Sequence, residues 1–253
     1  MKRRELLGSL AAAFLAAQQD RCDQPEIRLA VDVRPPARPA LAAGRHAAGE
    51  AGARRPWIHV PAGFDPGVDT PLLILLHGAG QSSDLFAPMT SNADAHGVVL
   101  LVPNSAGRTW DGIGGRFGRD VAGLGRVLEW TIERVRVDPG RLCIGGFSDG
   151  ASYALGLGLA NGDLFTHVMA LSPGFIPSRE RTGRPRLFIT HGTQDAILPI
   201  DRTSRTLVRA LENAGYPVEY HEFDGPHTMP PRQLEDAFAW LAGGTAGRAT
   251  RRD

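Results

Sequence analysis

The sequence predicts an α/β fold, in which a mostly parallel, doubly wound sheet carries helices on both faces. From residue 54 onward, short apolar runs alternate with longer stretches of helical periodicity, which is the pattern of repeated strand–helix units. Two runs, Leu72–Leu76 and Val98–Val102, are apolar at every position, as expected for strands covered on both faces. In such a sheet, functional groups lie in the loops that follow the carboxyl ends of the strands.

The individual elements follow from the same patterns in chain order. Apolar residues recur along the stretch 121–135 at the spacing of one helix face. Pro88 is expected to break the helical stretch 82–95, since a proline inside a helix removes a hydrogen bond. The expected strands are 57–60, 72–76, 98–102, 142–147, 168–171, 187–190 and 218–223, and the expected helices are 82–95, 121–135, 151–160, 203–214 and 234–241.

Composition excludes several classes of protein. The chain has 253 residues, 42% hydrophobic and 22% charged, which are globular values that argue against a mainly disordered chain. The formal net charge of +1 gives no cationic surface of the kind that binds nucleic acid or anionic membranes. Two cysteines allow at most one disulfide, and Cys143, inside an expected strand, is interpreted as a buried free thiol.

The segment Gly146-Phe-Ser148-Asp-Gly150 is a G-x-S-x-G motif. It lies between an apolar run and a helical stretch, the strand–turn–helix context of a nucleophile elbow. The two glycines remove the Cβ atoms that would keep helix and strand apart. Ser148 is therefore the candidate nucleophile, and the alternative is an ordinary glycine-rich turn.

A serine hydroxyl is a weak nucleophile without an adjacent base. In folds of this kind the acid and the base follow the serine, in that order. Asp195 follows the expected strand 187–190 and His227 follows the expected strand 218–223, so both fall at the same edge of the sheet. Asp201 competes as the acid, but its place at a helix start suits a capping role. We expect Asp195 to be the acid and His227 the base.

An oxyanion needs two preorganised donors. One is expected to be the backbone N–H of Asp149, the residue after the candidate nucleophile. The other is expected from the loop His77-Gly78-Ala79-Gly80, which follows an early apolar run, and Ala79 is the choice there.

The remaining patterns predict neither a metal nor a cofactor. The eight histidines are scattered without metal-ligand spacing, and His191 is interpreted as structural. The segment 78–83 nearly matches a dinucleotide-binding fingerprint, but it lacks the third Gly or Ala, and the next run ends without the acidic residue that holds a ribose.

Four segments together carry a family resemblance: HGAG after an apolar run, GFSDG, HGTQDAILP and GPHTMP. They resemble the phospholipase/carboxylesterase group of α/β-hydrolases, which grades into dienelactone-hydrolase-like and polyhydroxybutyrate-depolymerase-like esterases. The resemblance covers residues 56–242 and implies a serine esterase of α/β-hydrolase fold with the nucleophile, acid, base and oxyanion donors given above. Asp149 stands where that group commonly has glutamine, and the glycine-rich segment 104–118 looks more like the depolymerase-type members.

The substrate is expected to be a small-molecule ester. No insertion between the expected strands is long enough for a lid, so we expect an open site that favours short-chain or small aromatic esters. Trp110 is either an aromatic wall for the substrate or a loop tryptophan packed on the core. A peptidase or acyltransferase with the same triad, and a non-catalytic binding protein on a hydrolase scaffold, are the alternatives. Comparing amide with ester substrates distinguishes a peptidase or acyltransferase from an esterase. Labelling by a fluorophosphonate distinguishes an enzyme from a non-catalytic binding protein.

The ends of the chain are expected to lie outside the catalytic domain, which is predicted over residues 54–242. Residues 1–17 combine a basic start with a short apolar stretch, as export signals do, and Arg3-Arg4 resembles a twin-arginine signal. A periplasmic or secreted protein without stable membrane anchoring is expected, with a cytoplasmic one as the alternative. Residues 23–53 look like a linker, although Ile27–Val33 could form an edge strand, and 243–253 is expected to be a flexible tail. The sequence leaves the oligomeric state open.

Overall fold

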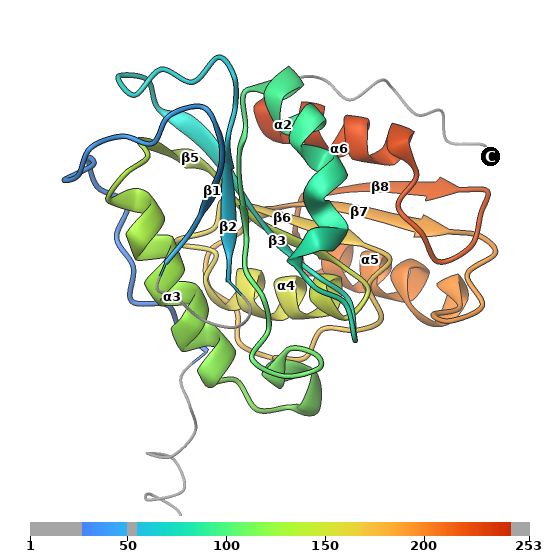
Figure 1. Ribbon diagram of the computed structural model, residues 1–253. Helices are drawn as coiled ribbons and strands as arrows, with labels where there is room; N and C mark the ends of the chain where they lie inside the picture. The colour runs from blue at the N-terminus through green and yellow to red at the C-terminus, as the bar shows by residue number, and fades with distance from the viewer. Residues whose placement is uncertain (1–26, 50–54, 244–253) are drawn as a thin grey trace, which may run out of the picture.

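In the computed structural model, residues 27–49 and 55–243 are described. Their eight strands form one sheet in the order β1-β2-β4-β3-β5-β6-β7-β8 (Figure 1). Pairing is antiparallel from β1 through β2 to β4 and parallel across the rest of the sheet. The strands are β1 Gly44–Ala47, β2 Trp57–Val60, β3 Thr70–Leu76, β4 Val99–Val102, β5 Val137–Phe147, β6 His167–Leu171, β7 Arg186–Gly192 and β8 Val218–Phe223.

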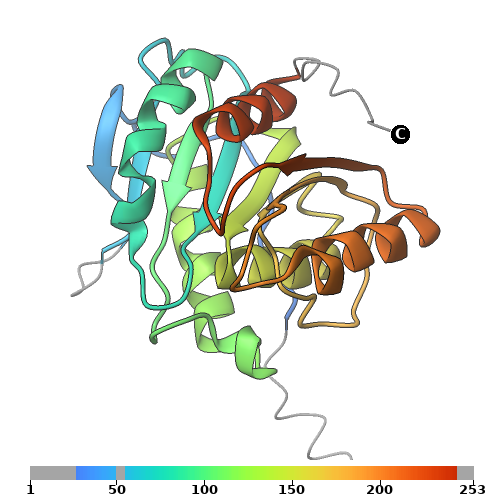
Figure 2. The same cartoon turned by 90° about the vertical axis from the view of Figure 1, so that its right-hand side faces the viewer.

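Helices cover both faces of the sheet, which confirms the predicted α/β class (Figure 2). The α-helices are α2 Thr90–His96, α3 Arg119–Ile132, α4 Asp149–Ala160, α5 Ser204–Asn213 and α6 Pro231–Ala242, and the 3-10 helices are η1 Ser83–Met89, η2 Asp111–Gly114 and η3 Ile200–Arg202. Helices α3, α4 and α5 pack on one face, and α2 and α6 on the other.

The uninterrupted apolar run of β3 follows from these two layers. Successive side chains of a strand point to opposite faces. Accordingly Leu72 and Ile74 belong to the core beneath α3 and α4, whereas Leu73 and Leu75 belong to the core beneath α2 and α6. The strand is central to the sheet, so both sets are buried.

The predicted elements are found with boundary shifts of a few residues. Pro88 lies inside η1, and the α-helical part of this stretch begins only at Thr90. Cys143 is a buried free cysteine, and burial raises the pKa of its thiol well above the usual range. Residues 1–26 and 244–253, which hold the export-signal prediction and nearly all of the predicted tail, lie outside the described residues.

The predicted domain start at residue 54 is too late. β1 pairs with β2 over four residues, and Ile27 and Ala48 are buried in the core. Ile27–Val33 forms no strand, but it is anchored to the end of α4. There the Asn161 side chain accepts from the N–H of Leu29 at 2.8 Å and donates to the carbonyl of Ile27 at 3.0 Å. The folded unit therefore includes residues 27–49.

Candidate active site

The turn that joins β5 to α4 is sharp and strained. Ser148 adopts φ 57° and ψ −120°, and it shares positive φ with only one other described non-glycine residue, Ser172. A Cβ at Gly146 would lie 2.5 Å from the backbone carbonyl carbon of Gly150, and a Cβ at Gly150 would overlap the carbonyl oxygen of Leu76. Only glycine therefore lets β5, α4 and β3 meet here. Strain of this kind concentrates at functional sites.

His227, in the loop after β8, lies beside this turn. Its Nδ1 donates to Asp195 Oδ2 at 2.6 Å, because an ionised carboxylate only accepts. Its ring packs on Phe147, the residue before Ser148, with ring centroids 4.7 Å apart. The Nε2 atom is buried and has no hydrogen-bond partner among the described residues. The neutral imidazole thus keeps a lone pair free at Nε2.

Asp195 is held as an anion in the loop after β7. Its Oδ1 accepts from the N–H groups of Ile197 at 2.9 Å and Leu198 at 2.8 Å. Burial acts to raise the pKa of Asp195, but the hydrogen bonds from Leu198, His227 and Ile197 outweigh burial, so its pKa lies below the ordinary value. A buried carboxylate of this kind holds an imidazole in one tautomer.

Two other carboxylates in the loops after β7 and β8 have different partners. Asp201 is exposed and pairs with Arg205 at 2.8 Å. Asp224 accepts a hydrogen bond from Gln194 Nε2 at 2.6 Å. Asp195 is therefore the one among the three whose carboxylate contacts His227.

The loop after β3 is held so that one backbone N–H stays free. The Gly78 carbonyl accepts from His77 Nδ1 at 2.8 Å and from the N–H of Gln81 at 3.2 Å. In a trans peptide the N–H points away from the carbonyl, so the Ala79 N–H points the other way, and it has no hydrogen-bond partner among the described residues. A Cβ at Gly78 would lie 3.3 Å from Ser148 Cβ. The free N–H therefore belongs to a loop that borders the elbow.

Asp149 supplies the second candidate donor. It is the first residue of α4, so its N–H has no partner within the helix. Its carboxylate accepts from Thr109 Oγ1 at 2.7 Å. This aspartate ties the glycine-rich segment 104–118 to the elbow, a contact that the sequence did not predict.

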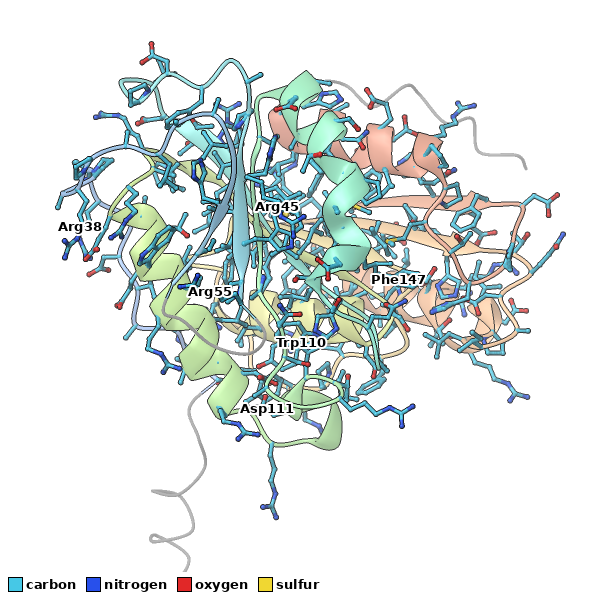
Figure 3. The ribbon with its side chains drawn as sticks, viewed as in Figure 1. Arg38, Arg45, Arg55, Trp110, Asp111 and Phe147 are labelled. Carbon is cyan, nitrogen blue, oxygen red and sulfur yellow. The ribbon has the colours of Figure 1, made fainter. Side chains whose placement is uncertain are left out.

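Trp110 lies in the core, next to Asp111 in the segment that leads into α3 (Figure 3). It is 1% exposed, its Nε1 donates to the His77 carbonyl at 2.8 Å, and its ring stacks on Tyr153 at 5.4 Å between centroids. Of the two interpretations of Trp110, burial favours packing on the core and contradicts the substrate wall. Through its hydrogen bond to His77, Trp110 holds the loop that contains Ala79 in place.

Two exposed apolar side chains near the site were not singled out from the sequence. Phe175, in the loop after β6, is 42% exposed, and Ile197, in the loop after β7, is 70% exposed. A Cβ at Gly174 would lie 3.3 Å from Leu198 Cδ2, so the two loops are in contact. We call Phe175 and Ile197 the apolar rim. The third exposed large hydrophobic residue of the described chain, Val68, precedes β3 at the opposite edge of the sheet.

Among the described residues we looked for a metal site and for a membrane-spanning helix. Within residues 27–49 and 55–243, no group of three or more His, Cys, Asp or Glu side chains is arranged to hold a metal ion. No helix in that part of the chain is long and apolar enough to cross a membrane.

Known proteins resemble this chain in sequence and in structure. The phospholipase/carboxylesterase family matches residues 121–243. An acyl-protein thioesterase 1 from Emericella nidulans is 26% identical over 213 residues, which cover 68% of this chain and 89% of the relative. A carboxylesterase from Bacillus cereus has a TM-score of 0.56 at 22% identity, over 71% of this chain and 90% of that one. The fluorophosphonate-binding serine hydrolase FphF from Staphylococcus aureus has a TM-score of 0.64 at 14% identity, over 79% and 99%.

The sheet order, the helices on both faces and these structural likenesses define an α/β-hydrolase fold. Within that class, the chain is a carboxylesterase-type serine hydrolase, and it is similar to the phospholipase/carboxylesterase family over residues 121–243 and to the thioesterase relative. This confirms the resemblance that the four motifs carry.

Proposed function

We propose that this chain hydrolyses carboxylic esters through an acyl-enzyme formed on Ser148. One observation carries the proposal. A buried imidazole, that of His227, has its Nδ1–H on the Asp195 carboxylate at 2.6 Å and its Nε2 unengaged, and it packs on the residue before Ser148. This is the arrangement that activates a serine hydroxyl as a nucleophile.

The reaction proceeds in two halves. Ser148 Oγ attacks the ester carbonyl carbon while its proton passes to His227 Nε2, and the developing oxyanion accepts from the N–H groups of Ala79 and Asp149. The tetrahedral intermediate collapses, the carbon–oxygen bond to the alcohol breaks, and His227 returns the proton to the alcohol. Water then attacks the acyl-serine by the same route and releases the acid. Asp195 stays ionised throughout and holds the imidazole in orientation.

The proposed substrates are esters with short acyl chains or small aromatic groups. The segment 172–185 between β6 and β7 contains no helix, so it adds no lid. The apolar rim offers exposed apolar surface on two loops beside the site, which suits a short acyl chain or a small aromatic group. Each buried methylene contributes about 0.8 kcal/mol only where there is a pocket to bury it.

A second substrate class, thioesters, is suggested by the relative named acyl-protein thioesterase. The same attack and the same oxyanion donors serve a thioester, with a thiol as the leaving group. Comparing kcat/KM for acetate esters and acetyl thioesters of matched leaving-group size distinguishes the two classes.

Replacing the proposed nucleophile tests the function. Ser148→Ala is expected to fold as the natural chain does and to lose several orders of magnitude in kcat on p-nitrophenyl acetate, because the acyl-enzyme can no longer form. Near-natural turnover in a sample verified by mass spectrometry contradicts the assignment. Cys143→Ala is the matched control, since it removes a buried thiol from β5, the strand that leads to Ser148, and is expected to keep activity.

Export to the periplasm or the medium is proposed from residues 1–17, in the part of the chain that the structure does not describe. Fractionation of cells that express the full chain, with and without Arg3→Lys and Arg4→Lys, tests it. Activity that stays in the cytoplasm for both chains contradicts export.

A further inference from the structure

Two histidines, not one, approach the same oxygen of Asp195. His227 Nδ1 lies 2.6 Å from Asp195 Oδ2, and His191 Nε2 lies 3.1 Å from it. His191 is at the end of β7 and is fully buried. A buried polar side chain beside a catalytic carboxylate affects its charge and its position, so a purely space-filling role is insufficient for His191.

The hydrogen bonds of His191 fix its protonation state. Its Nε2 is 2.8 Å from the Leu198 carbonyl, and because a carbonyl only accepts, Nε2 carries a proton. Its Nδ1 is 2.6 Å from Ser204 Oγ, and a neutral ring with Nε2–H accepts there from the hydroxyl. Burial lowers the pKa of His191, an effect that outweighs the Leu198 carbonyl and the Asp195 carboxylate. The ring is therefore neutral at neutral pH.

We propose that His191 is the positioning residue of the catalytic acid, a neutral N–H donor locked by Ser204 that orients Asp195 and moderates its charge toward His227. The inference rests on the proposed function of the Ser148 triad. His191 acts on Asp195 in two ways. His191 holds the Leu198 carbonyl while the Leu198 N–H holds Asp195 Oδ1, so one residue anchors the loop that carries the acid.

The second effect on Asp195 is electrostatic. The His191 N–H near Oδ2 reduces the negative charge on the oxygen that accepts the hydrogen bond from His227. Without it, Oδ2 stabilises protonated His227 more strongly, and the base holds its proton to a higher pH.

Other charged groups on the neighbouring elements α5 and β8 are paired with one another, and substitutions of His191 leave these pairs in place. From α5 and β8, Arg205 and Glu222 form an ion pair at 2.6 Å, and Tyr220 donates to Glu222 at 3.0 Å. Asp201 pairs with the same arginine. Asp195 and His227 are the titratable partners that His191 meets in the site itself.

A pair of side chains of similar shape tests the donor. Gln and Met are both unbranched and of similar length, but only Gln can donate from its end. In His191→Met, the acid limb of the kcat/KM profile is expected to move up by about 0.5 to 1 pH unit, and kcat to fall about fivefold, the equivalent of one neutral hydrogen bond. KM for p-nitrophenyl acetate is expected to stay unchanged. His191→Gln is expected to restore the natural profile.

The outcomes separate this inference from its alternatives. A natural pH profile in His191→Met, or equal shifts in the Met and Gln variants, overturns it. If His191→Met fails to fold, the ¹⁵N chemical shifts of the His191 ring in the natural chain serve instead. The inference predicts a protonated Nε2 and an unprotonated Nδ1, and a protonated Nδ1 overturns it. His167→Met, which removes a buried histidine at the other end of the sheet, is the control and is expected to leave the profile in place. Ser148→Ala tests the triad separately, so a failure of the proposed function is recognised independently.

Discussion

At the scale of single residues, the chemistry of the site depends on the hydrogen-bond partners of each side chain. Asp195 and Asp201 are chemically identical and six positions apart. Asp195 is buried against His227 with two backbone donors, whereas Asp201 is 78% exposed and paired with Arg205. A surface ion pair of that kind contributes little to stability, while a buried carboxylate can hold a base in place.

Exchanging each carboxylate for an amide separates these two roles. Asp195→Asn is expected to lower kcat by about three to four orders of magnitude, because the amide favours the wrong imidazole tautomer. Asp201→Asn is expected to stay within about twofold of the natural chain, since it breaks only an exposed pair. Steady-state kinetics on p-nitrophenyl acetate, with circular dichroism as the folding control, measure both. The assignment of the acid is wrong if Asp201→Asn is the more damaging change in a folded protein.

Residue types in their motifs were sufficient to predict that Asp195 and His227 lie together beside the turn at Ser148, because strand ends in a parallel sheet converge at one edge. The environment of Trp110 and the second histidine on Asp195 were not predictable in the same way. Trp110 depends on the His77 carbonyl, 33 positions away, and His191 depends on the fold of the loop that brings Ser204 and Asp195 to its ring. A tryptophan in a glycine-rich loop looks the same in sequence whether its ring is buried or exposed.

At the scale of elements, we propose that the loops after β6 and β7 select the ester substrate. The apolar rim lies on these two loops. The backbone N–H of Ile197 donates to Asp195, the proposed acid, whereas the side chain of Ile197 is mostly exposed. Apolar surface exposed beside a catalytic group, on loops fixed by a rigid sheet, is suited to contact the acyl or aromatic part of a small ester.

Polar replacements on the rim are expected to change substrate preference without harming the chemistry. In a p-nitrophenyl ester series from acetate to palmitate, the natural chain is expected to peak at a few carbons and then decline. Phe175→Ser and Ile197→Ser are each expected to lower kcat/KM for butyrate by about threefold to tenfold, as lost apolar contact of one or two methylenes implies, with little effect on acetate. Val68→Ser, an equally exposed change away from the site, is the matched control. A maximum at long chains, or rim variants that match Val68→Ser throughout the series, contradicts this role.

The central strands were predictable because their sequence alone reports burial. Residues Leu72–Leu76 of β3 and all of β4 are apolar, since both faces of these strands are covered. β1 was missed because Gly44-Arg-His-Ala carries no apolar alternation and lies in a stretch rich in Pro, Gly and Arg. It is a strand because β2 presents an edge to pair with, which is a non-local cause.

At the scale of the whole molecule, the segment 27–49 completes one side of the fold. It covers the edge of β2 with β1, and uncovered edge strands promote aggregation. It also satisfies Asn161, a fully buried side chain that binds the backbone of residues 27 and 29.

A chain that begins at Arg54 is therefore expected to melt at a lower temperature than the full chain and to aggregate more readily. A chain that begins at Pro25 retains all of these contacts and is expected to melt with the full chain. Asn161→Ala, which removes three hydrogen bonds, is expected to lower the free energy of unfolding by about 3 kcal/mol. Thermal and urea unfolding measure these effects. Equal stability of the two shortened chains would show that residues 27–49 are dispensable.

The most direct measurement of the central claim is to trap the acyl-enzyme itself. The natural chain is quenched in acid during turnover of p-nitrophenyl acetate and examined by intact mass and peptide mass spectrometry. The account predicts one acetyl group per chain, on the peptide that contains Ser148, and none in Ser148→Ala. An enzyme that turns over the ester at the natural rate with no acetyl group on Ser148, or with the acetyl group on another residue, would contradict it.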